Sequence, residues 1–204
     1  YVGGIAGLAS AVIRSSWAKL TLSGKSSVGG IVGSGSEDTS SSAGSGCTVT
    51  DCRSLVVVED CDQFSGAISG RDLGVFRGNY FVSDVLRGID RRSLSGQAEP
   101  MDYAAFCALG SVPEDFLSFT LRFVCDGRTL KTLRFDYGDS FDFSVFPSLT
   151  EQSGSYPVWD RTDLTDLRFD TVVTAEYTAY RASLQSDAQR ADGRSVFFVE
   201  GEFN

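Results

Sequence analysis

Apolar positions recur at a fixed distance along the first third of the chain. When the sequence is shifted by 36 residues, residues 11–30 align with residues 47–66 without a gap. Within each segment apolar residues alternate with polar ones, which predicts short β-strands. The positions that coincide are Ile13 with Val49, Leu20 with Val56, Leu22 with Val58, Val28 with Phe64 and Gly30 with Gly66.

A glycine-rich element accompanies each of these segments. Residues 2–7 (VGGIAG) read like residues 28–33 (VGGIVG), 26 positions later, and residues 64–69 (FSGAIS) form a looser version. The distances 26 and 36 differ by ten residues. We assign this difference to a flexible surface insertion, because residues 34–46 are rich in serine and glycine and cannot pack a core.

Short strands at these intervals predict a β-solenoid. A single coil cannot bury its own apolar face, so neighbouring coils stack on one another. We expect Gly4, Gly30 and Gly66 to allow tight turns between the strands, and Ile13 to stack on Val49.

The VGGIxG elements and the small or cysteine residue at Ser16 and Cys52 resemble GLUG-motif repeats, over about residues 1–70. That family occurs in large secreted and surface proteins of bacteria, including IgA-specific metallopeptidases. The resemblance implies a parallel β-solenoid in which Cys52, like the glycines, has a structural role. Residues 78–90 resemble the terminal stretch that follows such repeats.

A short helix is predicted between residues 99 and 110. Pro100 suits a first helical turn and Gly110 a helix end. Placed after the repeats, this helix is expected to cover the last coil, whose strands would otherwise be open to solvent. The apolar side of the helix is formed by Ala104, Ala105, Phe106 and Leu109.

The pattern then changes to a β-hairpin, in which Asp126-Gly127 provides the turn between two alternating strands. A later strand is predicted at residues 173–178. The segments DGRTLKTLRFDYGDSF, VWDR and FDTVVTAEYTAY resemble the internalin-type B-repeat over residues 115–180, with a shortened tail after Trp159. This resemblance implies a β-grasp, ubiquitin-like module of bacterial surface proteins.

The end of the chain is divided by composition. Residues 181–195 are polar and are predicted to form a linker, whereas residues 196–203 (VFFVEGEF) are predicted to form a strand. Two alternatives stay open for this strand: it begins a further module, or it adds to an existing sheet.

The predicted fold is therefore mainly β, with a short parallel β-solenoid followed by a small β-grasp, ubiquitin-like α+β domain. We divide the chain into a GLUG-like solenoid with its terminal segment (1–98), a capping or linking helix (99–114), a B-repeat-like domain (115–180) and a linker with a truncated strand (181–204).

The composition changes this picture in two ways. The chain has no histidine, which excludes Ser-His-Asp triads, Cys-His dyads and HExxH zinc sites. The net charge of −9 disfavours nucleic acid and anionic membrane surfaces as partners. Residues up to Val58 carry a net charge of +1, so the acidity belongs to the remainder.

Neither the cysteines nor the apolar runs indicate a disulfide framework, a metal site or a membrane-spanning segment. Five cysteines with no CxxC pair argue against a disulfide framework or a zinc site, and we interpret them as buried free thiols. No apolar run approaches the roughly 20 residues of a membrane span. Residues 5–13 do not have the pattern of a signal peptide or anchor, and we expect the chain to be an excised piece of a longer protein.

Four further groups were weighed as candidate chemistry, and for each a structural interpretation is favoured. Gly24-Lys25-Ser26 imitates the end of a P-loop but lacks its earlier glycine. Possible carboxylate catalysis rests on Asp51, Arg53, Glu59, Asp60 and Asp62. Possible calcium binding rests on Asp136, Asp139 and Asp142. Possible sugar stacking rests on Trp17, Trp159, Tyr156 and Tyr80.

These observations favour a non-enzymatic, structural and adhesive fragment of a large bacterial surface or secreted protein, without cofactor or metal. Its expected partners are host or cell-wall proteins or glycans and flanking domains of the same chain, with no membrane insertion. The alternatives are a glycan-binding accessory module of a secreted enzyme and a β-helix carbohydrate-active enzyme that uses carboxylates.

Overall fold

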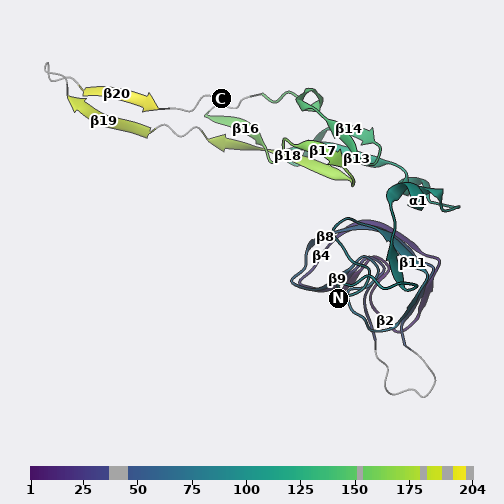
Figure 1. Ribbon diagram of the computed structural model, residues 1–204. Coiled ribbons are helices and arrows are strands. Elements are labelled where there is room, and N and C mark those ends of the chain that lie inside the picture. The colour runs from purple at the N-terminus through teal and green to yellow at the C-terminus, as the bar shows by residue number, and fades with distance from the viewer. Residues whose placement is uncertain (37–45, 151–153, 180–182, 190–194, 201–204) are drawn as a thin grey trace. The chain divides into compact units, whose positions relative to one another are not determined.

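The computed structural model describes residues 1–36, 46–150, 154–179, 183–189 and 195–200. The protein is mainly β, as the alternating pattern predicted, with 53% of the described residues in strands and 7% in helices. The chain divides into two compact units, Tyr1–Ser118 and Phe119–Asn204 (Figure 1). The boundary therefore falls four residues after the position expected from the sequence, residue 114.

The first unit contains three successive groups of strands, which we call strand sets. The first strand set comprises β1 (Val2–Gly3), β2 (Ala6–Ala9), β3 (Val12–Arg14) and β4 (Trp17–Ser23). The second comprises β5 (Ser26–Gly29), β6 (Val32–Gly35), β7 (Thr48–Thr50) and β8 (Arg53–Asp60). The third comprises β9 (Gln63–Gly66), β10 (Val75–Arg77) and β11 (Asn79–Val82), and β12 (Ala98–Pro100) follows.

Corresponding strands of successive sets pair in parallel. The sheet orders are β1-β5-β9, β2-β6, β3-β7-β10 and β4-β8-β11-β12. Isolated bridges from Val32 to Ser69 and from Ser69 to Ile89 continue the second sheet. In Figure 1 the successive sets overlay one another as loops. The strand sets thus form a stack in which each set contributes to the same sheets as its neighbour.

The predicted alignment holds up to a bulge and then shifts by one residue. Leu20 lies opposite Val56 and Leu22 opposite Val58, but Ser23 lies opposite Asp60. The extra residue in β8 moves every later pair, so that Gly29, and not Gly30, lies opposite Gly66. The predicted pairing of Gly30 with Gly66 is therefore wrong, because a β-bulge inserts one residue without interrupting the strand.

Apolar side chains from all strand sets fill the interior of the stack. Ile31, Val49, Ile68, Phe81 and Ile89 are fully buried there. Part of the predicted insertion also belongs to the stack, because Ser34 and Gly35 lie in β6 and are buried. Residues 37–45 of that insertion lie outside the described residues.

The expected helix is present as α1 (Tyr103–Ala108), followed by the 3-10 helix η1 (Glu114–Phe116). Its first turn does not contain Pro100, which lies in β12. The N-cap is Asp102, whose carboxylate accepts a hydrogen bond from the amide of Ala105 at 2.7 Å.

This segment returns to the first strand set. The ring of Trp17 on β4 makes edge contacts with Phe106 of α1, at a centroid distance of 5.4 Å, and with Phe116 of η1, at 5.5 Å. The ammonium group of Lys19 donates to the backbone oxygens of Asp115, at 2.7 Å, and Ser118, at 2.8 Å. Because Ala18 points into the core, its neighbours Trp17 and Lys19 point outward.

We call residues 102–118 the return segment. It begins beside the last strand, β12, and contacts the opposite edge strand of the same sheet, β4. The expectation that the helix covers the last coil is therefore wrong in its position: the return segment lies along the outer face of the four-stranded sheet. The sequence pattern around Trp17 gave no sign of this contact. An aromatic residue on the outward side of a strand can face solvent or be covered by another segment, and the pattern is the same in both cases.

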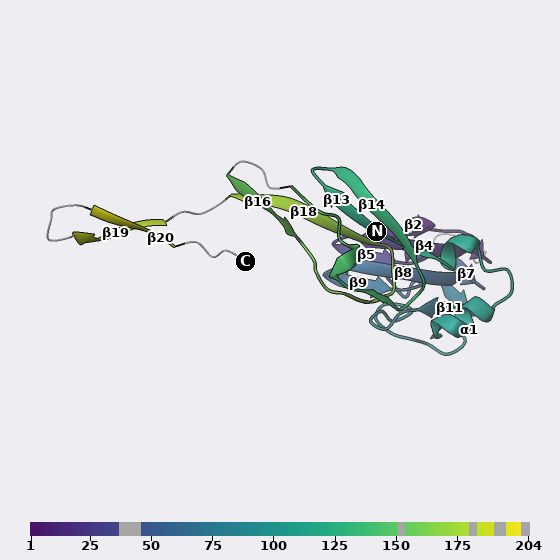
Figure 2. The same cartoon turned by 90° about the horizontal axis from the view of Figure 1, so that it is seen from above.

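The second unit has a four-stranded mixed sheet in the order β14-β13-β18-β16. β13 (Phe119–Cys125) and β14 (Arg128–Phe135) form an antiparallel hairpin, β18 (Thr171–Ala179) is parallel to β13, and β16 (Ser155–Trp159) is antiparallel to β18. Figure 2 shows these strands side by side. A two-stranded sheet of β15 (Asp139–Phe141) and β17 (Leu164–Leu167) completes the fold, with the 3-10 helix η2 (Phe143–Val145).

The hairpin predicted from Asp126-Gly127 is confirmed. Both residues have left-handed backbones, with φ of 49° and 72°, as a two-residue hairpin turn requires. Phe119, Leu121 and Phe123 alternate inward along β13 and are fully buried.

Aromatic rings close the core of this unit. Phe123, Phe146 and Trp159 lie within centroid distances of 5.0 to 5.6 Å of one another. The helical part of the predicted α+β domain is absent from the described residues of this unit, where η2 is the helical element.

The end of the chain corrects the predicted linker. β19 (Ser183–Gln189) lies within it and pairs antiparallel with β20 (Ser195–Glu200). These two strands form a sheet of their own, so β20 does not join the four-stranded sheet. A polar segment can form a strand when a neighbour supplies its backbone hydrogen bonds, which composition alone does not reveal.

Candidate functional site

The three glycines expected at turns occupy positions where no side chain fits. A Cβ atom on Gly4 would overlap the carbonyl oxygen of Gly30, and one on Gly30 would overlap that of Ala67. A Cβ on Gly66 would overlap the carbonyl oxygen of Ser69. None of the three has a positive φ. Gly4 and Gly30 do lie in the bends between β1 and β2 and between β5 and β6, as predicted, and Gly66 ends β9 directly before a bend. The close approach of backbones, and not a left-handed conformation, is what requires glycine at these bends.

Further bends of the stack contain residues with left-handed backbones. Ser15, Asp51 and Gly78 occupy equivalent positions in three successive strand sets, and all have left-handed backbones with φ of 49°, 52° and 61°. Ser27 in β5 and Phe64 in β9 also occupy equivalent positions and have left-handed backbones, with φ of 55° and 52°. Left-handed conformations cost roughly 1 to 2 kcal/mol in non-glycine residues, so the stack holds them in place.

The position after the first of these turns carries a column of hydrogen-bonding side chains. We call Ser16, Cys52 and Asn79 the turn column, because the strand registers align them. Ser16 donates to the carbonyl oxygen of Arg14 at 2.9 Å, and the thiol of Cys52 donates to that of Thr50 at 3.3 Å. Ser16 and Cys52 thus each satisfy a backbone oxygen two residues earlier.

Asn79, in the third strand set, links the second set to the segment that leads into β12. Its side-chain oxygen accepts from the amide of Cys52 at 2.9 Å, and its side-chain nitrogen donates to the carbonyl oxygens of Val49 and Gln97, each at 2.9 Å. Asn79 is fully buried. Sequence reasoning missed it, because the spacing shortens from 36 to 27 residues and asparagine differs chemically from serine and cysteine.

The expected stacking pair, Ile13 and Val49, lies three residues before Ser16 and Cys52 of the turn column. Ile13 lies opposite Val49, and Phe76 continues this row in the third strand set. Val49 is fully buried, while Ile13, on the edge strand, is half-buried.

The cysteines are all free, but not all are buried. Cys47, Cys52 and Cys125 are buried, whereas Cys61 and Cys107 are half-buried, which corrects the expectation for these two. Burial raises the pKa of the Cys47, Cys52 and Cys125 thiols. They therefore stay protonated at neutral pH and are poor nucleophiles.

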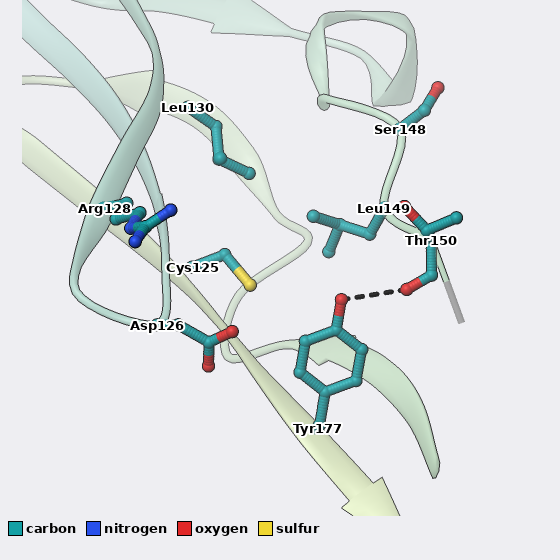
Figure 3. Close-up of a pocket in the computed structure, with 8 residues that line it drawn as sticks. All are labelled: Cys125, Asp126, Arg128, Leu130, Ser148, Leu149, Thr150 and Tyr177. Carbon is teal, nitrogen blue, oxygen red and sulfur yellow. Dashed lines mark hydrogen bonds between the residues drawn. The ribbon is translucent and has the colours of Figure 1, made fainter. Parts of the chain in front are cut away.

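The second unit has a pocket at the turn end of the β13–β14 hairpin, with a volume of about 510 Å³ (Figure 3). Cys125 and Arg128 come from the hairpin, Leu149 and Thr150 from the segment after η2, and Tyr177 from β18. The Tyr177 hydroxyl donates to the backbone oxygen of Thr150 at 2.9 Å. Sequence reasoning missed this pocket, since its walls come from three separate segments without a local motif.

The thiol that lines this pocket does not have the lowered pKa of a reactive cysteine. Its thiol, Cys125, has a raised pKa because of burial and the neighbouring Asp126 carboxylate. The pocket can hold a small ligand, but the residues described around it provide no activated nucleophile or general base.

Among the carboxylates considered for catalysis, Asp51 lies far from Glu59 and Asp60. Asp51 lies in the turn before β8, whereas Glu59 and Asp60 lie at its far end, and all three are exposed. An eight-residue strand is about 26 Å long, against the roughly 5 to 9.5 Å between two glycosidase carboxylates. Asp62 is also exposed, and Arg53 donates to the backbone oxygens of Cys52 and Gly78.

The other candidate groups have local structural roles. Asp139 accepts from the amide of Asp136, at 2.8 Å, and Asp142 caps η2 through the amide of Ser144, at 2.9 Å. The hydrogen bonds from Ser144 lower the pKa of Asp142. Among the described residues no three Asp, Glu, Cys or His side chains gather as a metal site. Residues 24–26 lead from β4 into the strand β5, whereas a P-loop leads into a helix.

Three of the four candidate aromatic residues are engaged in packing. Trp17 contacts the return segment and Trp159 contacts Phe123 and Phe146. Tyr80 lies beneath the guanidinium group of Arg53, 4.7 Å from the ring centroid. Tyr156 also has a partner, and with 38% of its surface exposed it is the most accessible of the four to a sugar.

Comparisons with protein-family models, curated proteins and solved structures found no match to this chain. In the part of the chain that the structure describes, no helix is both long enough and apolar enough to cross a membrane.

Proposed function

We propose that this chain is a non-enzymatic, structural and adhesive piece of a large bacterial surface or secreted protein. In this proposal the first unit is a short parallel β-solenoid of the GLUG kind, and the second is a β-grasp module of the internalin B-repeat kind. Together they act as a stiff stalk or protein-interaction module, outside the cell, that carries flanking domains.

The observation that carries the proposal is the register of the first unit. Three strand sets contribute in parallel to the same sheets, with Val28 opposite Val2 and Ser65, and with Ile13, Val49 and Phe76 in one row. Stacked sets of this kind gain stability from each neighbour and resist extension across many backbone hydrogen bonds at once.

The strand order of the second unit supports the β-grasp part of the proposal. β13 and β18, the first and last strands of the sheet, run parallel at its centre, and an antiparallel strand flanks each of them. A β-grasp module is expected to have this arrangement. Its edge strands β14 and β16 offer backbone groups to a partner strand.

A non-catalytic role fits the fate of the candidate residues. Asp51 lies about a strand length from Glu59 and Asp60, the buried thiols have raised pKa values, and the aspartates near η2 accept local hydrogen bonds. The polar groups of the turn column serve the backbone of the stack.

Single-molecule force spectroscopy on the full chain between protein handles tests the proposal. A stalk element predicts a distinct force peak for the first unit, with a gain in contour length of about 400 Å for its 118 residues. Asn79→Ala should lower this peak clearly, and Ser16→Ala, at the equivalent but half-buried position, should lower it much less. Extension of the first unit without a force peak would contradict the stalk function.

Two further measurements separate the alternatives. Binding to a glycan array that is lost in Tyr156→Ala would favour a glycan-binding module. Polysaccharide cleavage that is lost in Asp51→Asn or Asp60→Asn would favour an enzyme and overturn the proposal.

A further inference from the structure

The two edges of the four-stranded sheet in the second unit differ. One edge is β16, a strand of five residues with Pro157 at its centre. Directly after it, the amide of Asp160 donates to the carbonyl oxygen of Thr174 on β18 at 2.8 Å. Successive residues of a strand turn their amides to opposite sides, so the Pro157 nitrogen faces the open side. Proline has no amide hydrogen, and this edge therefore lacks a donor for a further strand.

The other edge, β14, has eight residues and no proline. On its neighbour β13, the amide of Thr120 donates to the side chain of Asp170, directly before β18, at 2.7 Å. The backbone groups of Thr120 and Arg122 thus face β18. Thr132 and Arg134 lie opposite Arg122 and Thr120, so their amides and carbonyls turn away from β13. β14 therefore presents unobstructed backbone donors and acceptors at its open side.

This edge is also rich in unpaired positive charge. The strands β13 and β14 contain no acidic residue, and their cations are Arg122, Arg128, Lys131 and Arg134. Lys131 donates to the backbone oxygen of Val145 at 2.6 Å. The three arginines are exposed, and in the part of the chain that the structure describes no carboxylate pairs with them. Elsewhere in this unit Arg168 pairs with Asp166 at 2.7 Å.

The two faces of the sheet beside this edge have different chemistry. Arg122 and Arg134 lie on the outer face, because they alternate with the buried residues Leu121 and Phe135. The small Thr132 lies between them on that face. On the core face Leu133 is only half-buried at the edge. A strand added to β14 would meet cations with one set of its side chains and an apolar surface with the other.

We propose that the open side of β14 binds an extended acidic segment of a partner protein by antiparallel strand addition. Acidic side chains of the partner lie beside Arg122 and Arg134, and the apolar residues that alternate with them pack beside Leu133. Charge argues against a second copy of β14, because its own cations would meet these arginines. The inference names a partner for the protein-interaction function proposed above and rests on that proposal.

Fluorescence anisotropy of a labelled peptide of alternating glutamate and valine, titrated with the full chain, tests the charge part of the proposal. The peptide should bind at low ionic strength and bind more weakly as salt screens the charges. Arg122→Gln and Arg134→Gln should each weaken binding about twofold to fivefold. Arg161→Gln removes an exposed arginine from the same unit and is the matched control, which should leave binding unchanged.

The backbone part is tested separately. Thr132→Pro copies the arrangement of Pro157, since it removes an outward amide and leaves the pairing with β13 intact. It should weaken binding about tenfold, and Thr132→Ala should not. Two N-methylated peptides test the same contact on the unmodified chain. In the antiparallel arrangement the glutamate amides face β14, so methylation of every glutamate nitrogen should abolish binding and methylation of every valine nitrogen should not.

Three results would overturn the proposal. The first is no binding of the alternating peptide at low ionic strength. The second is an equal effect of the two methylated peptides. The third is binding that Arg134→Gln weakens but that Thr132→Pro and both methylations leave unchanged, which would identify a site for polyanions such as acidic polysaccharides. None of these results alters the force peak of the first unit, so a failure here is distinguishable from a failure of the stalk function.

Discussion

Asn79→Ala should destabilise the first unit more than any other single loss of a polar side chain in the described stack. The side chain makes three hydrogen bonds of 2.9 Å, to the amide of Cys52 and the carbonyl oxygens of Val49 and Gln97. Asn79 is fully buried, so water does not replace these partners. An unpaired buried amide costs roughly 1 to 3 kcal/mol.

The three losses differ in size. The Cys52 amide would lose its side-chain acceptor altogether. The carbonyl of Gln97 still accepts from the backbone amide of Asn79 at 3.2 Å, so its loss is smaller. With about 2 kcal/mol for the amide, about 1 kcal/mol for the carbonyl of Val49 and about 0.5 kcal/mol for that of Gln97, Asn79→Ala should lower the free energy of unfolding by about 3.5 kcal/mol. That is a large part of the roughly 5 to 15 kcal/mol of a typical domain.

Urea unfolding followed by Trp17 fluorescence measures this loss, in a Trp159→Phe background so that the first unit alone is reported. Ser16→Ala is the matched control, because its hydroxyl is only half-buried and donates to a single backbone oxygen, so it should cost less than about 1 kcal/mol. A loss below about 1 kcal/mol in Asn79→Ala would refute the reasoning.

The charge state of a substituted side chain adds a second check. Asn79→Asp keeps an acceptor for the Cys52 amide but faces the carbonyls of Val49 and Gln97 with a carboxylate. Burial should raise the pKa of this new carboxyl above its unfolded value. The variant should therefore be least destabilised at acid pH, where the protonated carboxyl donates a hydrogen bond, and should lose stability as the pH rises through the raised pKa.

Three further predictions concern packing and thiols. Gly30→Ala should destabilise the first unit by about 3 kcal/mol or more in urea unfolding, because the new methyl group meets a backbone oxygen, while Gly110→Ala, with open space around it, should be neutral or slightly stabilising; equal effects would contradict the close-approach argument. Ser54→Ala should raise the thermal midpoint, since the buried Ser54 hydroxyl has no hydrogen-bond partner in the described structure, and a clear loss would show that it has one. Titration with a thiol reagent should find two of the five cysteines accessible in the native protein and three only after unfolding; a total below five in the unfolded, unreduced protein would reveal a disulfide.

The sequence predicted those parts of the fold that depend on side-chain alternation. The distance of 36 residues correctly placed Leu20 opposite Val56, and Asp126-Gly127 correctly marked the hairpin. It could not show the bulge in β8, because an extra residue inside a strand leaves the alternation nearly intact on both sides. The polar segment that forms β19 was missed for a related reason, since its pairing partner lies elsewhere in the chain.

The candidate residues show the same division. Gly4, Gly30 and Gly66 were correctly expected at bends between strands, but the reason for glycine there was not found, because glycine serves both a left-handed turn and a close backbone approach. The return segment was predicted as a helix, yet its contact with Trp17 joins positions about 90 residues apart, and no local pattern encodes it. Asn79 escaped notice because its value depends on three partners that are distant in the sequence, two in the second strand set and one before β12.

The return segment alters how the first unit should lose its structure. A row of stacked sets whose contacts are only between neighbours can unravel from one end, one set at a time. Here Phe106 and Phe116, which follow the last strand in the sequence, rest on Trp17 of the first set. Peeling away the first set strips these rings of their packing, and detaching the segment exposes the sheet behind them. The ends of the row are thereby coupled, and the unit should unfold in a single cooperative step.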